Sequence, residues 1–210
     1  AQLFDNASHL NGIKAMADGD NYSMLSFGPF TLEDSRNGIS PSGGLAHFYP
    51  AAWHLVTALA CAALGVSAAL AENASIVVMV GLVFPLSMWL LLTKVFDGDR
   101  RLIVCGSVCT LAFSAFPWYF LVFGPLYSNL AAFVVVPAAV FVTISFIESC
   151  CSGGIRVRDL LVVLVMGVAL ASLQPNAVFS VAVLSAPICA GTMVKLLAER
   201  GVSAKKRKSI

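Results

Sequence analysis

Long apolar runs without charged side chains constrain the fold of this chain more than any other feature of its sequence. A run of roughly 18 or more such residues is long enough to cross a hydrocarbon core about 30 Å thick as a helix. Five apolar segments follow one another, at about residues 74–96, 102–123, 128–148, 159–173 and 177–198. Only 11% of the 210 residues are charged, against about 25% in an ordinary soluble domain. The sequence therefore predicts an all-α membrane protein, a polytopic helical bundle with about five transmembrane helices spread over residues 74–198.

Residues 1–73 are more polar than the rest of the chain, and we expect them to form one outward loop that contains helices. Apolar residues recur at helical spacing from Leu3 to Ala17, and Gly19 follows as a stop signal. This pattern predicts an amphipathic helix over residues 3–18.

A second helix is expected to begin at Pro50 and to continue to about Leu70. Its modest hydrophobicity and the Trp53-His54 pair near its start favour a position along the membrane surface. The alternative is that residues 51–70 cross the membrane, which would move the polar loop to the cytoplasmic side.

The basic residues predict which ends of the five segments face the cytoplasm. They lie at alternate ends, at Lys94, Arg100, Arg101, Arg156, Arg158, Lys195 and Arg200. By the positive-inside rule these ends face inward. The opposite ends, at residues 72–73, 123–129 and 174–176, carry no Lys or Arg and are expected to face outward.

The two ends of the sequence give further expectations. The chain opens on Ala1 without an initiator Met or a signal-peptide pattern, so we expect it to be a fragment of a longer protein. Residues 199–210 include the run Lys205-Lys206-Arg207-Lys208. In a membrane chain such a run is typical of a cytoplasmic segment, and we expect no nucleic-acid partner.

Chemistry is expected in the outward layer, because no charged residue lies in the interior of the five predicted segments. That absence weakens a proton-coupled or ion-coupled transporter. Asp5 and His9 share one face of the first predicted helix. A carboxylate beside histidines can act as a general base or bind a divalent metal. The candidate binding residues that accompany Asp5 are His9, His47, Tyr49, His54, Tyr127, Asn129, Gln174 and Asn176.

Each of these residues also has a purely structural interpretation. An Asp-His pair four residues apart is common on solvated helices, and His54 after Trp53 is equally a membrane-interface residue. The stretch Gln174-Pro175-Asn176 is typical of a simple turn between two spans.

Four stretches together resemble a known superfamily. They are Asp5-Asn6-Ala7-Ser8-His9, His47-Phe48-Tyr49-Pro50-Ala51-Ala52-Trp53-His54, Phe123-Gly124-Pro125-Leu126-Tyr127-Ser128-Asn129 and Gln174-Pro175-Asn176-Ala177-Val178-Phe179-Ser180. The first two resemble the first external loop of the polytopic glycosyltransferases of the C superfamily, which use lipid-linked sugar donors. More closely, the chain resembles an uncharacterised, largely actinobacterial group of multi-spanning proteins built on the same plan.

The resemblance implies a bacterial, multi-pass plasma-membrane protein that transfers a sugar from a polyprenyl-phosphate donor on the outer face. It implies that Asp5 is the catalytic base on the acceptor hydroxyl. The departing phosphate would then be stabilised by Lys14, Arg36, the histidines or a metal. The usual second acidic residue is replaced by Asn6. Two alternatives stay open: a transporter or lipid flippase, and a noncatalytic membrane scaffold. The replacement of the second acidic residue by Asn6 favours the scaffold.

Overall fold

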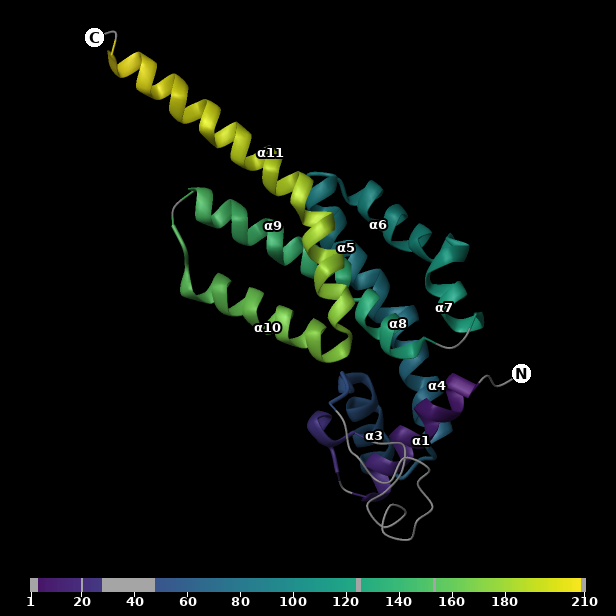
Figure 1. Ribbon diagram of the computed structural model, residues 1–210. Helices are drawn as coiled ribbons and strands as arrows, with labels where there is room; N and C mark the ends of the chain where they lie inside the picture. The colour runs from purple at the N-terminus through teal and green to yellow at the C-terminus, as the bar shows by residue number, and fades with distance from the viewer. Residues whose placement is uncertain (1–3, 20, 28–47, 124–125, 153, 209–210) are drawn as a thin grey trace.

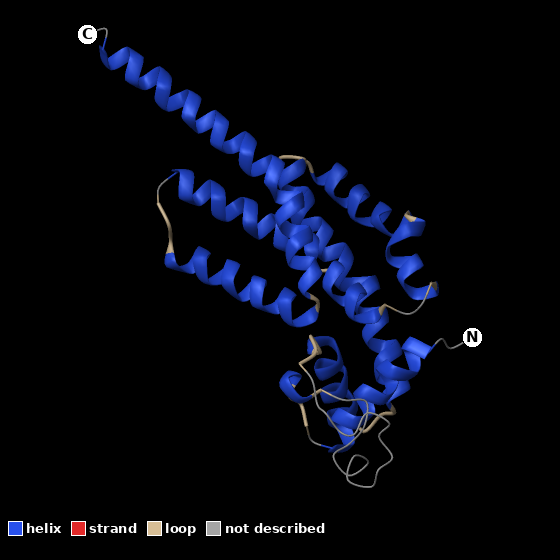
Figure 2. Cartoon of the chain, viewed as in Figure 1, coloured by secondary structure: helices blue, strands red, loops and turns tan. Residues whose placement is uncertain are grey.

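The computed structural model describes residues 4–19, 21–27, 48–123, 126–152 and 154–208. Within these residues the chain is all-helical and contains no β-strand, as Figure 2 shows. The elements, named as in Figure 1, are α1 (Phe4–Gly19), η1 (Met24–Ser26), α3 (Ala52–Leu64), α4 (Ala68–Val78), η2 (Met79–Val83), α5 (Phe84–Val95), α6 (Arg100–Cys109), η3 (Thr110–Ala112), η4 (Ser114–Trp118), α7 (Tyr119–Val122), α8 (Tyr127–Phe133), α9 (Val136–Ser152), α10 (Val157–Leu173) and α11 (Pro175–Lys208). The predicted all-α membrane bundle is confirmed.

Three continuous helices in the described part of the chain are long and apolar enough to cross a membrane. They cover Ala68–Val95, Tyr127–Cys151 and Pro175–Val194. A fourth crossing is formed if the bent pair Arg100–Ala112 and Ser114–Val122, with 41° between its halves, acts as one span. The remaining expected segment, residues 159–173, corresponds to α10, whose 17 residues lie at the short end of the range of about 17–25 residues that a membrane-spanning helix needs.

The two halves of this bent pair are separated by Phe113, which has extended backbone angles, with φ −80° and ψ 123°. Phe116, inside the second half, is also extended, with φ −139° and ψ 132°. It precedes Pro117, and the residue before a proline is sterically pushed out of the helical region. The helical path is therefore interrupted at two places, at Phe113 and before Pro117.

The boundary between the second predicted helix and the first span differs from the sequence prediction. We expected one helix to continue to about Leu70 and the next to begin near residue 74. Instead α3 ends at Leu64, because Gly65 adopts a left-handed conformation with φ 63°. The Ser67 side chain then accepts a hydrogen bond from the Leu70 backbone and starts α4.

The length of α3 bears on whether it crosses the membrane. With 13 residues, α3 is about 20 Å long at 1.5 Å per residue, well below the thickness of a hydrocarbon core. The helix is too short to span. Its position along the membrane surface remains an expectation from the sequence.

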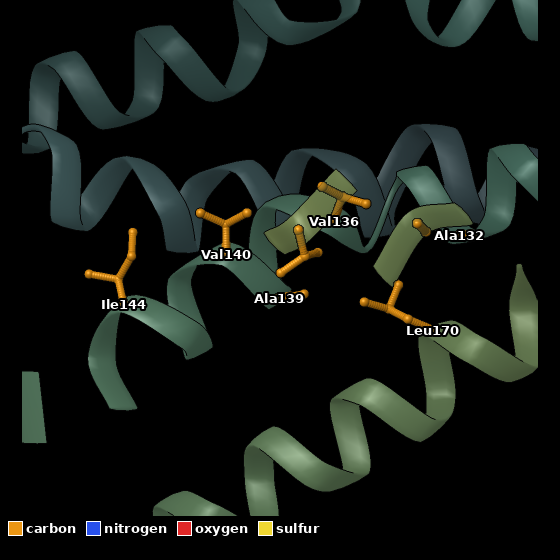
Figure 3. Packing of buried hydrophobic residues seen from close by; sticks show 8 residues of the cluster. Ala132, Val136, Ala139, Val140, Ile144 and Leu170 are labelled. Carbon is orange, nitrogen blue, oxygen red and sulfur yellow. The ribbon is translucent and has the colours of Figure 1, made fainter. Parts of the chain in front are cut away.

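The bundle core lies between α8, α9, α10 and α11. Figure 3 shows its buried residues Ala132, Val136, Ala139, Val140, Ile144 and Leu170, which Ala177 and Val181 complete. A polar contact joins α5 to this core, because the Ser87 hydroxyl accepts a hydrogen bond from the Ala138 backbone at 2.9 Å. The Ala138 amide lies in the first turn of α9, where backbone N–H groups have no acceptor within the helix, and the Ser87 hydroxyl supplies that acceptor.

The helices α1 and α3 form a separate outer layer at one end of the bundle (Figure 1). Their contact buries Ile13 and Met16 of α1 against Trp53 and Ala58 of α3, with Ala131 of α8 beneath them. The layer lies at the same end as the start of α4, the start of α8 and the α10–α11 turn (Figure 1). These are the ends that lack basic residues in the sequence.

Candidate functional site

Two histidines from different helices meet in the outer layer. The imidazole Nδ1 of His9, on α1, lies 2.8 Å from Nε2 of His54, on α3. The residues are 45 positions apart in the sequence, and the packing of α1 on α3 brings them together. His54 is buried, with 1% of its surface exposed.

Burial determines the charge of His54. Loss of solvent contact, followed by the neighbouring His9, lowers its pKa from 6.5 to about 3. His54 is therefore neutral at physiological pH, and only one of its ring nitrogens carries a proton. Its Nδ1 is buried without a hydrogen-bond partner in the described residues. A buried N–H without an acceptor is costlier than an unused acceptor, so we assign the proton to Nε2, which donates to His9.

Aromatic rings surround the histidine pair. The His9 ring packs edge-on to Trp53 at 5.5 Å between centroids and lies 5.6 Å from Tyr127. On the other side, Tyr49 stacks on Phe27 at 4.8 Å, and both rings lie against His54. Such packing fixes the ring orientations, because each aromatic contact has a preferred geometry.

A cavity of about 300 Å³ opens beside this cluster. Its lining comes from α1, α3, α8 and the segments that precede α3 and α8: Ser8, His9, Phe27, Tyr49, His54, Leu126, Ser128 and Asn129. Four of the predicted binding residues thus line one cavity: His9, Tyr49, His54 and Asn129. The sequence did not single out the other four as binding residues: Ser8, Leu126 and Ser128 lie in the stretches that carry the resemblance, and Phe27 had no distinguishing pattern. The Ser128 hydroxyl is buried and has no hydrogen-bond partner among the described residues.

The remaining predicted residues lie around this cavity or outside the described side chains. Tyr127 contacts His9, and Asn176 donates a hydrogen bond from Nδ2 to Oδ1 of Asn129 at 3.0 Å. Gln174 does not line the cavity, and its Oε1 is buried without a described partner. The backbone of Asp5 lies in α1, one turn before His9, but its side chain is outside the described part of the structure. His47 lies outside the described residues altogether.

Two candidate ligands for the predicted divalent metal, Asp5 and His47, lie outside the described side chains. Among the described residues, no group of three or more His, Cys, Asp or Glu side chains is arranged to hold a metal ion. His9 and His54 direct ring nitrogens at each other, which commits one nitrogen of each to their mutual hydrogen bond. The described residues therefore present a hydrogen-bonding and aromatic site.

The chain was compared with known protein families, curated proteins and solved structures. A family model described as "Family of unknown function (DUF6541)" matches residues 1–210. The chain belongs to this family. No curated protein and no solved structure matches the chain. The DUF6541 match covers the outer layer and the bundle together, so the cavity lies inside the region that defines the family.

One buried carboxylate of this DUF6541 chain was not anticipated. The sequence placed Glu72 in an outward turn, whereas α4 begins at Ala68 and places Glu72 inside the spanning helix Ala68–Val95. Its side chain is 3% exposed, and Oε2 has no hydrogen-bond partner in the described residues. Glu72 is the fifth residue of this span and precedes the segment predicted from residue 74, so the prediction for the interior of the five segments did not cover it. Its position before a long apolar run was the available signal.

Glu72 is connected to the aromatic cluster through its own helix. The Trp53 indole N–H donates to the Ser75 hydroxyl at 3.1 Å, and that hydroxyl donates to the Glu72 backbone carbonyl at 2.7 Å. This chain of hydrogen bonds joins α3 to α4. The buried Glu72 carboxylate therefore lies on the helix that contacts both helices of the outer layer, α1 and α3.

Proposed function

We propose that the chain is the outward membrane module of a glycosyltransferase-like protein of a bacterial plasma membrane. It would transfer a sugar from a lipid-linked, polyprenyl-phosphate donor on the outer face. The observation that carries the proposal is the cavity of about 300 Å³ lined by His9, His54, Tyr49 and Asn129, at the end of the bundle where the ends of the spans carry no basic residues.

The position of the cavity suits an amphiphilic donor. It lies between the outer layer and the ends of the spanning helices, where a polyprenyl tail can stay in lipid while a phosphate and sugar enter a polar site. Its volume is at the lower end of the range of about 300–1,000 Å³ that is typical of small-molecule sites. Tyrosine, histidine and asparagine supply hydrogen bonds for sugar hydroxyls, and the aromatic rings supply apolar faces.

The reaction needs a base for the acceptor hydroxyl and a group that stabilises the departing phosphate. The acceptor hydroxyl oxygen attacks the anomeric carbon, the bond from that carbon to the phosphate oxygen breaks, and the polyprenyl phosphate leaves with the bonding electrons. A base removes the proton from the acceptor hydroxyl, and we assign this task to Asp5, one helical turn before His9.

The charge state of the site limits what can stabilise the departing phosphate. His54 is neutral and serves as a hydrogen-bonding group, not as a cation. Lys14 is exposed and forms an ion pair with Asp18 on its own helix. We propose that His9, which lines the cavity, is a hydrogen-bonding group for the phosphate. Arg36, the remaining candidate cation, lies outside the described residues.

The test uses the full-length parent protein in membranes supplied with labelled sugar on polyprenyl-phosphate donors. Asp5→Asn is compared with Asp18→Asn, a matched control on the same helix whose carboxylate is exposed. We expect Asp5→Asn to lower the transfer rate by about 10²-fold or more, the range that a general base contributes. Asp18→Asn should stay within about twofold. Equal transfer by both variants would remove Asp5 as the base, and no transfer by the wild type with any donor would favour the scaffold.

A second candidate is a transporter or lipid flippase, and the burial of Glu72 in a spanning helix favours it. Ionisable side chains inside membrane helices frequently mark substrate or proton pathways. The test is movement of a labelled lipid across vesicles that contain the full-length protein. Movement that Glu72→Gln abolishes would support the transporter, whereas wild-type vesicles that move no lipid would eliminate it.

A further inference from the structure

A second cavity lies at the opposite end of the bundle from the histidine cluster. It has a volume of about 480 Å³ and lies between α5, α9 and the start of α10. Its charged lining comes from Lys94, Arg156, Arg158, Glu148 and Asp159. By the positive-inside rule, the basic residues place this cavity at the cytoplasmic face.

The charges are ordered around the cavity by contacts between helices. Lys94 on α5 pairs with Glu148 on α9, and Arg158 pairs with Asp159 at 3.2 Å. The Ser149 hydroxyl donates to the Asp159 carboxylate at 2.8 Å. Each of the two carboxylates in the lining is therefore paired with one cation, Glu148 with Lys94 and Asp159 with Arg158.

The third cation gives the cavity an excess of positive charge. Arg156 has no carboxylate within ion-pair distance among the described residues. Three cations and two carboxylates leave the lining with a net charge of +1. Arg156 also directly precedes the N-terminus of α10, where the helix dipole favours an anion.

The inner wall of the cavity is built for a ligand that is both polar and apolar. Ser145 lines it, and its hydroxyl oxygen is buried without a hydrogen-bond partner in the described residues. Phe141 and Phe146 of α9 and Val162 of α10 add apolar surface beside it. An unpartnered buried hydroxyl costs free energy that a ligand oxygen can recover.

We propose that this cavity binds the phosphate group of an anionic phospholipid of the inner leaflet. Arg156 and Arg158 contact the phosphate, the Ser145 hydroxyl donates to one of its oxygens, and an acyl chain lies against Phe141, Phe146 and Val162. Basic pockets between membrane helices on the cytoplasmic side suit anionic headgroups for this reason. The site is separate from the outward cavity, so it does not depend on the proposed sugar transfer.

The experiment measures binding of phosphatidylglycerol to the detergent-solubilised full-length protein by native mass spectrometry, with phosphatidylcholine as the neutral comparison. Arg156→Gln is compared with Arg101→Gln, which removes a charge at the same membrane face but does not line the cavity. Because one cation near an anionic lipid contributes about fivefold in affinity, Arg156→Gln should weaken the tightest phosphatidylglycerol site by about that factor. Arg101→Gln should change it by less than about twofold.

A third variant keeps the net charge unchanged. Ser145→Ala should weaken the same site by about tenfold, since it removes a hydrogen bond to a charged group. Equal effects of Arg156→Gln and Arg101→Gln, together with no effect of Ser145→Ala, would show diffuse electrostatic attraction and overturn the proposal. A parallel arm adds inorganic phosphate without phosphatidylglycerol. If inorganic phosphate alone protects the protein from thermal unfolding and phosphatidylglycerol is not preferred, the site binds a soluble anion. That result would overturn the proposal of a phospholipid site.

Discussion

Acidification should destabilise the outer layer through His54. In the folded protein its pKa is about 3, whereas in the unfolded chain it returns to the ordinary value of 6.5. The unfolded state therefore binds more protons than the folded state between these two values, so stability falls as the pH is lowered through this window. At pH 7.5 both states are neutral at His54 and the contribution is fully present.

The size of the effect follows from the two pKa values. Between pH 7.5 and pH 5 the protonation of His54 in the unfolded state lowers the free energy of unfolding by about 2 kcal/mol. For a chain of this length that corresponds to a decrease of about 4–8 °C in melting temperature. Carboxylates and the other histidines add their own pH dependence to the free energy of unfolding. The contribution of His54 is therefore measured as the difference between the wild type and a variant without this histidine.

The assay compares thermal unfolding of the wild type and of His54→Gln in detergent at pH 7.5 and pH 5. Glutamine keeps a polar side chain but does not titrate in this range. We expect the wild type to lose about 2 kcal/mol more than His54→Gln between the two pH values. The same loss in both proteins would refute the reasoning, because it would mean that His54 is not held neutral by burial.

Three further changes test the packing around the outward cavity. Gly12→Ala should lower the free energy of unfolding by about 1–2 kcal/mol, because the added Cβ would lie 2.7 Å from the Phe27 ring. The control is Gly167→Ala on α10, whose added Cβ meets nothing within 4 Å and which should be neutral or stabilising. A decrease of equal size in both glycine variants would show that the Phe27 contact is not the cause. Trp53→Phe should cost about 1–2 kcal/mol in thermal unfolding, since it removes the hydrogen bond to Ser75; an unchanged melting temperature would remove that bond from the α3–α4 contact. Asn176→Ala should speed hydrogen exchange at the start of α11 by a few fold, through loss of its hydrogen bond to Asn129, and unchanged exchange there would contradict it.

Local sequence patterns were sufficient for the class of fold and for much of the helix order. The apolar runs predicted spanning helices because lipid leaves the backbone no hydrogen-bonding alternative to helix. The apolar spacing before Gly19 predicted α1 to within a residue of its observed bounds, Phe4–Gly19. The end of α3 was predicted too late, because apolar residues continue beyond Leu64 to Leu70 and obscure the stop at Gly65 and the cap at Ser67.

The candidate site was only partly accessible from the sequence. The sequence named His9, His54, Tyr49 and Asn129 as candidates, and the structure places all four around one cavity. It did not indicate that the two histidines contact each other, because residues 45 positions apart have no local pattern in common. Phe27 was missed for the same reason.

What the sequence by itself determined is the membrane class, the helical content and the distribution of positive charge at alternate ends of the spans. These properties depend on composition and on local backbone preferences, which act over a few residues. The tertiary structure decided which side chains lie together and which are removed from solvent: the contact of His9 with His54, the burial of Glu72 and the cavity beneath Arg156. Burial and proximity are properties of packed helices, and they set the charge states and the cavities on which any function of this chain depends.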